Sequence, residues 1–289
     1  MISDSSKRPQ ALSFRNHDRD LAGLTYVYAV LSRRAGGVSV GINLNPNNAC
    51  NWHCAYCQVP GLVRGKAPEI DLAKLEDELH GFLGDLVQGD WMQRFVPEDM
   101  RVIRDIAFSG NGEPTSAKVF PEAVELAIRL RAEFGLAAER VPLRLITNGS
   151  LMGQPDVLAA VGRLAEAGGE VWFKVDAGTA DGIERVNGVR LEPASVARNL
   201  ARCAAACPTW VQTCMFRWDG AGPSAVDIEA YLALLELADP SRLEGVLLYG
   251  LARQSMQPEA SHLSALSAEE LEAIASDIRK KGLTVRVSP

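Results

Sequence analysis

The sequence predicts an α/β fold with a parallel sheet, and two repeating patterns carry that prediction. Short apolar runs rich in Val, Ile and Phe alternate with longer stretches in which apolar residues recur every three or four positions. Six such pairs follow one another, which favours parallel strands with helices outside them. A closed barrel of this type has eight units, so the six predict an open three-quarter barrel or a doubly wound sheet.

The individual elements follow from these patterns. The expected strands are 38–44, 105–110, 143–149, 170–177, 210–216 and 245–252, with a short edge strand at 284–288. The expected helices are 69–88, 119–134, 155–167, 193–206, 224–238 and 268–281. Capping or first-turn residues stand at or near the starts of most of these helices, as they should: Asp71, Pro121, Pro155, Pro193 and Ser267.

The N-terminal region differs from the rest of the chain. Residues 1–20 are polar, and residues 21–35 have the apolar spacing of an amphipathic helix that ends at Gly36-Gly37. No linker or internal repeat marks a boundary later in the sequence. These observations predict an N-terminal extension over residues 1–36 and a single core domain over residues 37–289.

Composition and charge restrict the class of partner. The 289 residues carry a net charge of −6, and 47% of them are hydrophobic, which is ordinary for a globular protein. An acidic chain has no general attraction to phosphate backbones, so its charge argues against a nucleic-acid partner. No apolar run reaches the ~20 residues of a membrane span, and the N-terminus lacks the apolar core of a signal peptide. We therefore expect a cytoplasmic protein with no membrane partner.

Three of the six cysteines stand close together after the first predicted strand. Cys50, Cys54 and Cys57 are separated by three residues and then by two, which in a reducing cytosol indicates metal ligation before disulfides. Thiolates suit zinc and iron–sulfur clusters alike, but structural zinc takes four ligands, usually as two pairs. A four-iron cluster held by three cysteines keeps one iron open for a substrate. A zinc loop and incidental thiols are the alternatives.

Other polar and Gly-rich segments follow later strands, at the rim where parallel α/β folds build their sites. The run 109–115, Ser-Gly-Asn-Gly-Glu-Pro-Thr, follows the second strand, and its glycines allow close approach to the backbone. Asn148 and Asp176 lie at the ends of the third and fourth strands, and Arg253 follows the sixth. Asp176 could accept hydroxyl donors, and Arg253 could pair with a carboxylate. Ordinary turns and rim salt bridges are the alternative for these residues.

The C-x3-C-x2-C spacing, with an aromatic residue before the last cysteine and a Gly-Asn-Gly-Glu-Pro run one unit later, resembles the radical S-adenosylmethionine (SAM) superfamily. The resemblance implies a partial (β/α)6 TIM barrel of the radical SAM type. It implies a [4Fe–4S] cluster on the three cysteines, with SAM at the open iron. SAM's amino group would be received at the Gly-rich run through backbone carbonyls and the glutamate. The residues it implies at SAM are Tyr56, Gly110, Asn111, Gly112, Glu113, Asn148, Asp176 and Arg253, with Asn111 in place of the family's second glycine.

The motif order narrows the resemblance further. From Ser32-Arg33-Arg34 to Ala252-Arg253 it is similar to the iron–sulfur oxidoreductases related to the wybutosine-synthesis (4-demethylwyosine synthase-like) enzymes, which modify a guanosine in tRNA. Gln254 departs from that pattern, where proline is expected. The resemblance implies reductive cleavage of SAM, with flavodoxin or ferredoxin as the low-potential electron donor. The resulting 5′-deoxyadenosyl radical would abstract hydrogen from an unidentified substrate.

The substrate class follows from charge rather than from the resemblance. An acidic chain favours a small molecule or a peptide over tRNA. Two alternatives stay open: a tRNA-modifying enzyme of the wybutosine type, and a metal-binding regulatory module without turnover.

The other three cysteines have two interpretations. Cys203 and Cys207 are four residues apart on one predicted helix, and Cys214 lies on the next strand. Together they could hold an auxiliary cluster. Their Ala-rich and apolar surroundings favour the alternative, that they are small buried hydrophobic residues, because ligands split between a helix and a strand lack loop spacing.

Overall fold

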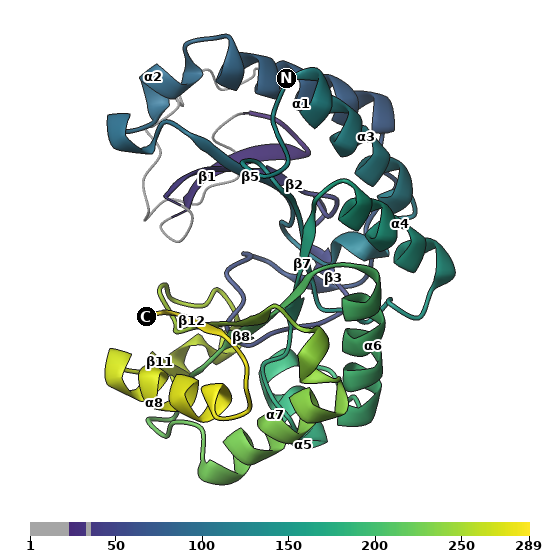
Figure 1. Ribbon diagram of the computed structural model, residues 1–289. Coiled ribbons are helices and arrows are strands. Elements are labelled where there is room, and N and C mark those ends of the chain that lie inside the picture. Colours follow the sequence, from purple (N-terminus) through teal and green to yellow (C-terminus); the bar gives the residue numbers. More distant parts are fainter. Residues whose placement is uncertain (1–22, 33–35) are drawn as a thin grey trace.

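The computed structural model describes residues 23–32 and 36–289, and one eight-stranded sheet forms its centre. The strands are β1 (Val27–Ser32), β2 (Gly37–Ile42), β5 (Ile103–Phe108), β6 (Leu143–Thr147), β7 (Glu170–Lys174), β8 (Thr209–Cys214), β10 (Gly245–Tyr249) and β12 (Val285–Ser288), in that spatial order. All neighbours are parallel except β1 and β2. The sheet curves into an open C with β1 and β12 at its ends (Figure 1), so the predicted partial (β/α)6 barrel is confirmed.

The six predicted helices cover the outer side of this sheet (Figure 1). They are α1 (Leu72–Val87), α3 (Phe120–Glu133), α4 (Pro155–Glu166), α6 (Pro193–Ala206), α7 (Ala225–Leu237) and α8 (Ala268–Arg279). The cap residues act as expected: Asp71 accepts a hydrogen bond from the backbone of Lys74, and Ser267 forms a capping box with Glu270. Prolines occupy the first turns of α3, α4 and α6.

The helix predicted over residues 21–35 is wrong where the structure describes it. Val27–Ser32 is strand β1, which pairs antiparallel with β2 from Val27 opposite Ile42 to Ser32 opposite Gly37. Tyr, Val and Leu have high strand propensity, and Val27, Ala29 and Leu31 alternate into the core with a period of two. The main sheet therefore begins before residue 37, where the core domain was expected to start, and that boundary falls inside the β1–β2 pair.

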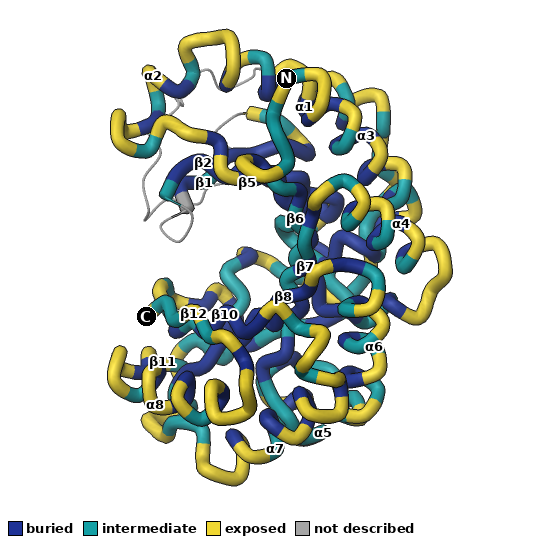
Figure 2. The backbone as a smooth tube through the Cα atoms, viewed as in Figure 1, coloured by how far each residue is buried: buried dark blue, intermediate teal, exposed yellow. Residues whose placement is uncertain are grey.

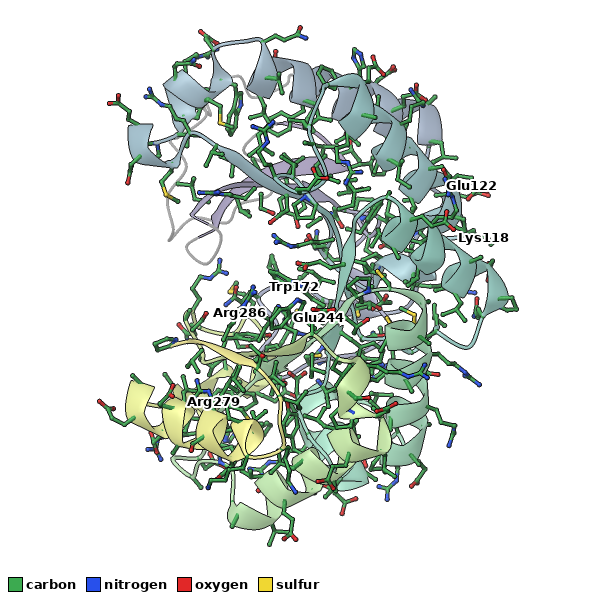
Figure 3. All side chains as sticks on the ribbon, in the orientation of Figure 1. Lys118, Glu122, Trp172, Glu244, Arg279 and Arg286 are labelled. Carbon is green, nitrogen blue, oxygen red and sulfur yellow. The ribbon has the colours of Figure 1, made fainter. Side chains whose placement is uncertain are left out.

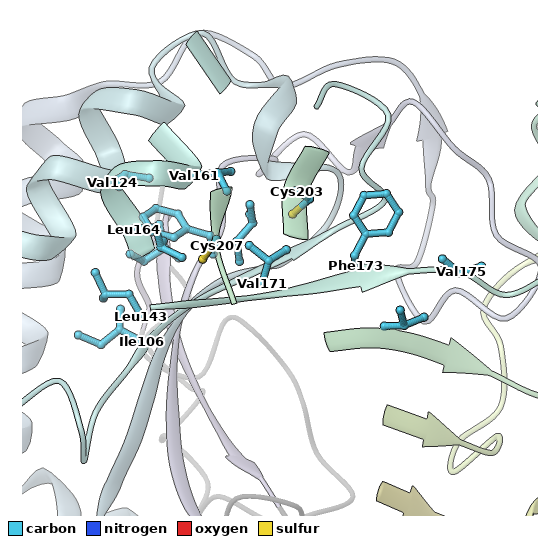
Figure 4. Close-up of a cluster of buried hydrophobic side chains, with 14 of the residues drawn as sticks. Ile106, Val124, Leu143, Val161, Leu164, Val171, Phe173, Val175, Cys203 and Cys207 are labelled. Atoms are coloured by element: carbon cyan, nitrogen blue, oxygen red, sulfur yellow. The ribbon is translucent and has the colours of Figure 1, made fainter. Parts of the chain in front are cut away.

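The strands of the central sheet are mostly buried (Figure 2). Side chains alternate between the two faces of the sheet, and those of the outer face pack against the helices as the core. On β7, Val171 and Phe173 are fully buried and lie among apolar side chains of α3, α4 and α6 (Figure 4). Trp172 and Lys174 alternate with them along the strand and so belong to the inner face. Trp172 is found toward the concave side of the sheet in Figure 3, whereas Glu122 lies on the outer, helical side.

Ion pairs fill the inner face near the amino-terminal ends of its strands. Arg144 of β6 bonds to Asp105 of β5 and donates to Glu170 of β7 over 2.6 Å. The hydroxyl of Ser39 on β2 also donates to Asp105. Arg144 thus joins three neighbouring strands at this end of the inner face. Parallel α/β sheets bind ligands at the opposite, carboxyl-terminal end of their strands.

Several short elements were not expected from the sequence. They are β3 (Ala49–Cys50), β4 (Val63–Arg64), β9 (Phe216–Trp218), β11 (Leu263–Ala265), α2 (Trp91–Phe95) and α5 (Ala180–Asn187). β3 is part of the cysteine loop, and β4, β9 and α5 contact that loop. Within the described ranges, no helix has the length and apolar character to cross a membrane.

Candidate functional site

The cysteine trio lies in the loop that leaves β2 at the carboxyl-terminal rim. Cys50 ends the short strand β3, which pairs with β4, and its carbonyl accepts a hydrogen bond from Gly65 N over 2.9 Å. Cys54 and Cys57 lie in one turn, in which Cys57 N donates to Cys54 O over 2.9 Å. The loop is thus a folded unit that fixes the backbone of all three cysteines.

Burial governs the acidity of two of the thiols. It is the largest cause of a pKa raised to about 11 at Cys50 and to about 12 at Cys54, to which negative charge on Cys57 also contributes. Without a metal both thiols are therefore protonated at neutral pH, which disfavours a role as free nucleophiles.

The donor set fits a four-iron cluster. All three cysteines are half-buried and unpaired by disulfides. In the part of the chain that the structure describes, no group of three His, Cys, Asp or Glu side chains is placed to hold a single metal ion.

The Gly-rich run after β5 is packed against the cysteine loop. Gly112 lies directly against Ala49, the residue before Cys50. A Cβ added at Gly112 would lie 2.1 Å from the carbonyl oxygen of Ala49, and one at Gly110, where φ is +132°, would lie 2.4 Å from Asn43 Oδ1. Only glycine permits this approach of the two loops. The predicted neighbourhood of the cysteine loop and the Gly-rich run is therefore present.

Asn111 takes part in the same contact. Its backbone N–H donates to Asn43 Oδ1 over 3.1 Å, and its side-chain Nδ2 donates to Asn48 Oδ1 over 2.6 Å. Asn43 Oδ1 also accepts from Asn45 N over 3.0 Å. The residue that departs from the family's second glycine thus binds the cysteine loop with its side chain.

Glu113 is 2% exposed, and its carboxylate bonds to the chain itself. Oε1 accepts from Thr115 N, Thr115 Oγ1 and Thr147 Oγ1 at 3.2, 2.6 and 2.7 Å, and Oε2 accepts from Asn148 N at 2.7 Å. Burial raises the pKa of this carboxyl, and the hydrogen bonds oppose that shift. Glu113 therefore joins the Gly-rich run to the end of β6.

Asn148 continues this connection into the cysteine loop. Its Nδ2 donates to Asn51 Oδ1 over 2.8 Å, and Asn51 Nδ2 donates to Ser150 Oγ over 2.7 Å. Asn148 Oδ1 accepts from Ser150 N over 3.0 Å. The structure therefore brings the predicted residue Asn148 to the segment between Cys50 and Cys54.

Asp176 and Tyr56 form a buried pair beside Cys54. Tyr56 OH donates to Asp176 Oδ2 over 2.6 Å, and Cys214 N donates to Asp176 Oδ1 over 2.9 Å. Asn187 Nδ2 also donates to Asp176 Oδ2, over 2.7 Å. Both carboxylate oxygens thus have donors within the chain. The pKa of Tyr56 is raised well above its usual range by burial and by the charge of Asp176, so the phenol stays a neutral donor.

Comparison with known families agrees with this arrangement. Residues 44–235, about two thirds of the chain, match the family described as the radical SAM superfamily. The chain belongs to the radical SAM superfamily. Its members bind SAM and a [4Fe–4S] cluster as a class, so the chain is an enzyme. No curated protein has significant sequence similarity to it.

Solved radical SAM structures share the fold. A radical SAM methyltransferase from Sphaerobacter thermophilus has a TM-score of 0.61 at 16% identity, over 91% of this chain and 68% of the other. Archaeal TYW1 has a TM-score of 0.50 at 16% identity, over 84% of this chain and 71% of the other. At this identity the similarity concerns the fold, and the fold is the expected partial barrel.

The inner face of this radical SAM barrel carries a cation and an unpaired amide beside the cysteine loop. Lys174 and Gln212 are registered partners on β7 and β8, and so share that face. Lys174 Nζ donates to Tyr249 OH over 3.2 Å and lies 4.9 Å from the centre of the Tyr56 ring. Burial lowers the pKa of Lys174, but the neighbouring acidic groups Tyr249 and Asp176 outweigh it, and the pKa is raised above its usual value. Gln212 Oε1 is buried and has no hydrogen-bond partner among the described residues.

Two residues of the segment after β10, to which the sequence analysis assigned no role, donate hydrogen bonds to carbonyls of the cysteine loop. Ser255 Oγ donates to Ala55 O over 2.6 Å, and Gln257 Nε2 donates to Cys57 O over 3.1 Å. They follow the predicted residue Arg253, which is half-buried in the segment after β10. Arg33 and Arg34, also part of the motif order, lie outside the described residues.

The remaining cysteines are buried among apolar side chains. Both Cys203 of α6 and Cys207 belong to the outer core, where Cys207 lies beside Leu164 and Val171 (Figure 4). Cys214 packs with Tyr56 and Phe216 on the other face. Their surroundings match the interpretation of these thiols as small hydrophobic residues.

Proposed function

We propose that this enzyme cleaves SAM reductively at a [4Fe–4S] cluster held by Cys50, Cys54 and Cys57, and that the product radical abstracts hydrogen from a small substrate. The observation that carries the proposal is the contact between the two motifs, in which Gly112 packs against the carbonyl of Ala49 and Asn111 Nδ2 donates to Asn48 Oδ1 over 2.6 Å. This contact keeps the Gly-rich run next to the cysteine loop, and a SAM molecule that binds both the cluster and the Gly-rich run would need the two to be adjacent.

Different residues of the chain would hold the cluster and SAM. A cluster bound by the three thiolates would supply the electron that splits SAM into methionine and a 5′-deoxyadenosyl radical. Gly110 and Gly112 keep the backbone open beside Cys50, where SAM's amino group would bind. Asn111 and Glu113 hold that run in place through their own side chains.

Tyr56, Asn148, Asp176 and Arg253 complete the proposed surroundings of SAM. Asn148 and Asp176 contact the loop on both sides of Cys54, through Asn51 and Tyr56 respectively. The substrate would lie on the inner face, where the Lys174 ammonium suits an anionic group and the unpaired Gln212 oxygen suits an N–H or O–H donor. This supports a small molecule or a peptide, with flavodoxin or ferredoxin as the proposed reductant.

The test is product analysis on protein reconstituted anaerobically with iron and sulfide. With dithionite and SAM, the enzyme is expected to form 5′-deoxyadenosine slowly, even without substrate. The Cys54→Ala variant, treated identically, is the control and is expected to form none. A cluster-replete wild-type sample that yields no 5′-deoxyadenosine would overturn the proposal.

A further inference from the structure

Asn187 links the cysteine loop to Asp176 with a single side chain. It is the last residue of α5 and is 1% exposed. Its Nδ2 lies 3.4 Å from Cys54 Sγ and 2.7 Å from Asp176 Oδ2. An amide nitrogen carries two N–H groups, so it can donate to the sulfur and to the carboxylate at once.

Asp176 determines which way this amide points. A carboxylate accepts hydrogen bonds and donates none, so it selects the amide nitrogen of Asn187 over the oxygen. The carboxylate is itself held by Cys214 N at Oδ1 and by Tyr56 OH at Oδ2. The N–H that faces Cys54 is therefore oriented by a fixed group rather than by a mobile one.

The backbone of α5 keeps the distance between Asn187 and Cys54. His53 N donates to Asn187 O over 3.0 Å, and Ala55 N donates to Val186 O over 2.8 Å, so both neighbours of Cys54 bind the end of the helix. Gly188 follows with φ of +65°, and a Cβ there would lie 2.5 Å from His53 O. Only glycine allows α5 to end this close to the loop.

We propose that Asn187 is a positioning residue that donates a hydrogen bond to the Cys54 thiolate of the bound cluster and raises its reduction potential, with Asp176 orienting the amide. The inference rests on the proposed function, because it requires a cluster on Cys54. Reduction adds negative charge to the cluster and its sulfurs. An N–H aimed at sulfur stabilises the reduced state more than the oxidised state, and hydrogen bonds to sulfur are among the terms that set cluster potentials.

The experiment is a redox titration of reconstituted protein, followed by electron paramagnetic resonance. Asn187→Leu removes the donor at similar volume, and Asn187→Asp keeps the shape while replacing the nitrogen by oxygen. Both variants are expected to shift the midpoint to more negative values. The reduced-to-oxidised ratio at a fixed potential should fall on the order of threefold to tenfold, and tenfold corresponds to about 59 mV for one electron.

Two further variants separate the specific role from a general loss of structure. Asn199→Leu removes a matched amide, which donates to the carbonyl of Gly149 over 3.0 Å rather than to sulfur, and should leave the midpoint unchanged. Asp176→Asn also removes a negative charge that acts directly on Cys54, and this loss raises the midpoint. The rise should be smaller in the wild-type background, where the Asn187 amide loses its orientation as well, than in the Asn187→Leu background.

The outcomes are distinct from those of the proposed function. Wild-type protein that binds no iron would refute the proposed function itself. If wild type assembles a cluster and both Asn187 variants keep its midpoint, the inference is overturned. It is also overturned if both variants lose the cluster, or if thermal unfolding of the apoproteins shows that they no longer fold, because Asn187 would then act as a structural brace only.

Discussion

Glu113 Oε2 and the backbone N–H of Asn148 lie 2.7 Å apart and join the second βα loop to the third. The other oxygen of the same carboxylate binds Thr115 and Thr147. The glutamate of the Gly-rich run is thus part of the framework that holds the cofactor loops together. Because this buried carboxylate accepts four hydrogen bonds, we expect its removal to lower the free energy of unfolding.

Glu113→Ala is expected to destabilise the apoprotein, because it leaves buried donors of Thr115, Thr147 and Asn148 without an acceptor. We expect a loss of about 1–3 kcal/mol in the free energy of unfolding, measured by denaturant titration. Glu113→Gln keeps one acceptor oxygen and should lose less. Glu122→Ala, on the exposed first turn of α3 (Figure 3), is the control and should change stability by no more than about 0.5 kcal/mol. Equal stability of the two alanine variants would contradict the structural role of Glu113.

Cys54→Ala is expected to abolish cluster assembly, whereas Cys203→Ala should retain it. Cys54 lies in the folded loop of the trio, while Cys203 is buried in the outer core with its sulfur 3.5 Å from Thr209 Oγ1. Iron analysis of reconstituted protein should give about four irons per chain for wild type and for Cys203→Ala. If both variants lost iron equally, the assignment of one cluster to the trio would fail.

Gly112→Ala should disrupt the contact between the two cofactor loops. Its Cβ would lie 2.1 Å from Ala49 O and 2.7 Å from Asn45 Cγ, so one of the loops has to move. We expect weaker SAM binding in equilibrium dialysis with reconstituted protein. Gly162→Ala is the matched control, because a Cβ there has no neighbour within 4 Å and Gly162 lies inside α4. That substitution should stabilise the protein by about 0.5–1 kcal/mol and leave SAM binding unchanged.

No specific tRNA binding is expected. The chain has 30 Lys and Arg against 36 Asp and Glu, and affinity for nucleic acid depends on the number of phosphates that cations neutralise. Filter binding with total tRNA at near-physiological salt should show nothing tighter than the ~10⁻⁴–10⁻⁶ M of non-specific contacts. Saturable binding below micromolar would instead support a tRNA-modifying enzyme.

The sequence by itself determined the order of strands and helices, the position of the cysteine loop after the first parallel strand, and the glycines of the second loop. These features are local, because apolar periodicity, caps and cysteine spacing are properties of consecutive residues. The same local reasoning failed for β1, whose apolar residues fit a helical spacing. They alternate as a strand because pairing with β2 buries them.

Only the tertiary structure decided which side chains surround the cysteines. Asn187 reaches Cys54 from 133 positions away, and Gln257 reaches the carbonyl of Cys57 from 200 positions away. Such contacts form because the βα loops come together at one rim of the curved sheet. The spacing of residues within each loop does not predict which residues of different loops will be in contact. The partners of a buried carboxylate such as Glu113 or Asp176 are likewise set by the fold, because burial requires each oxygen to find whichever donors the neighbouring loops bring to it.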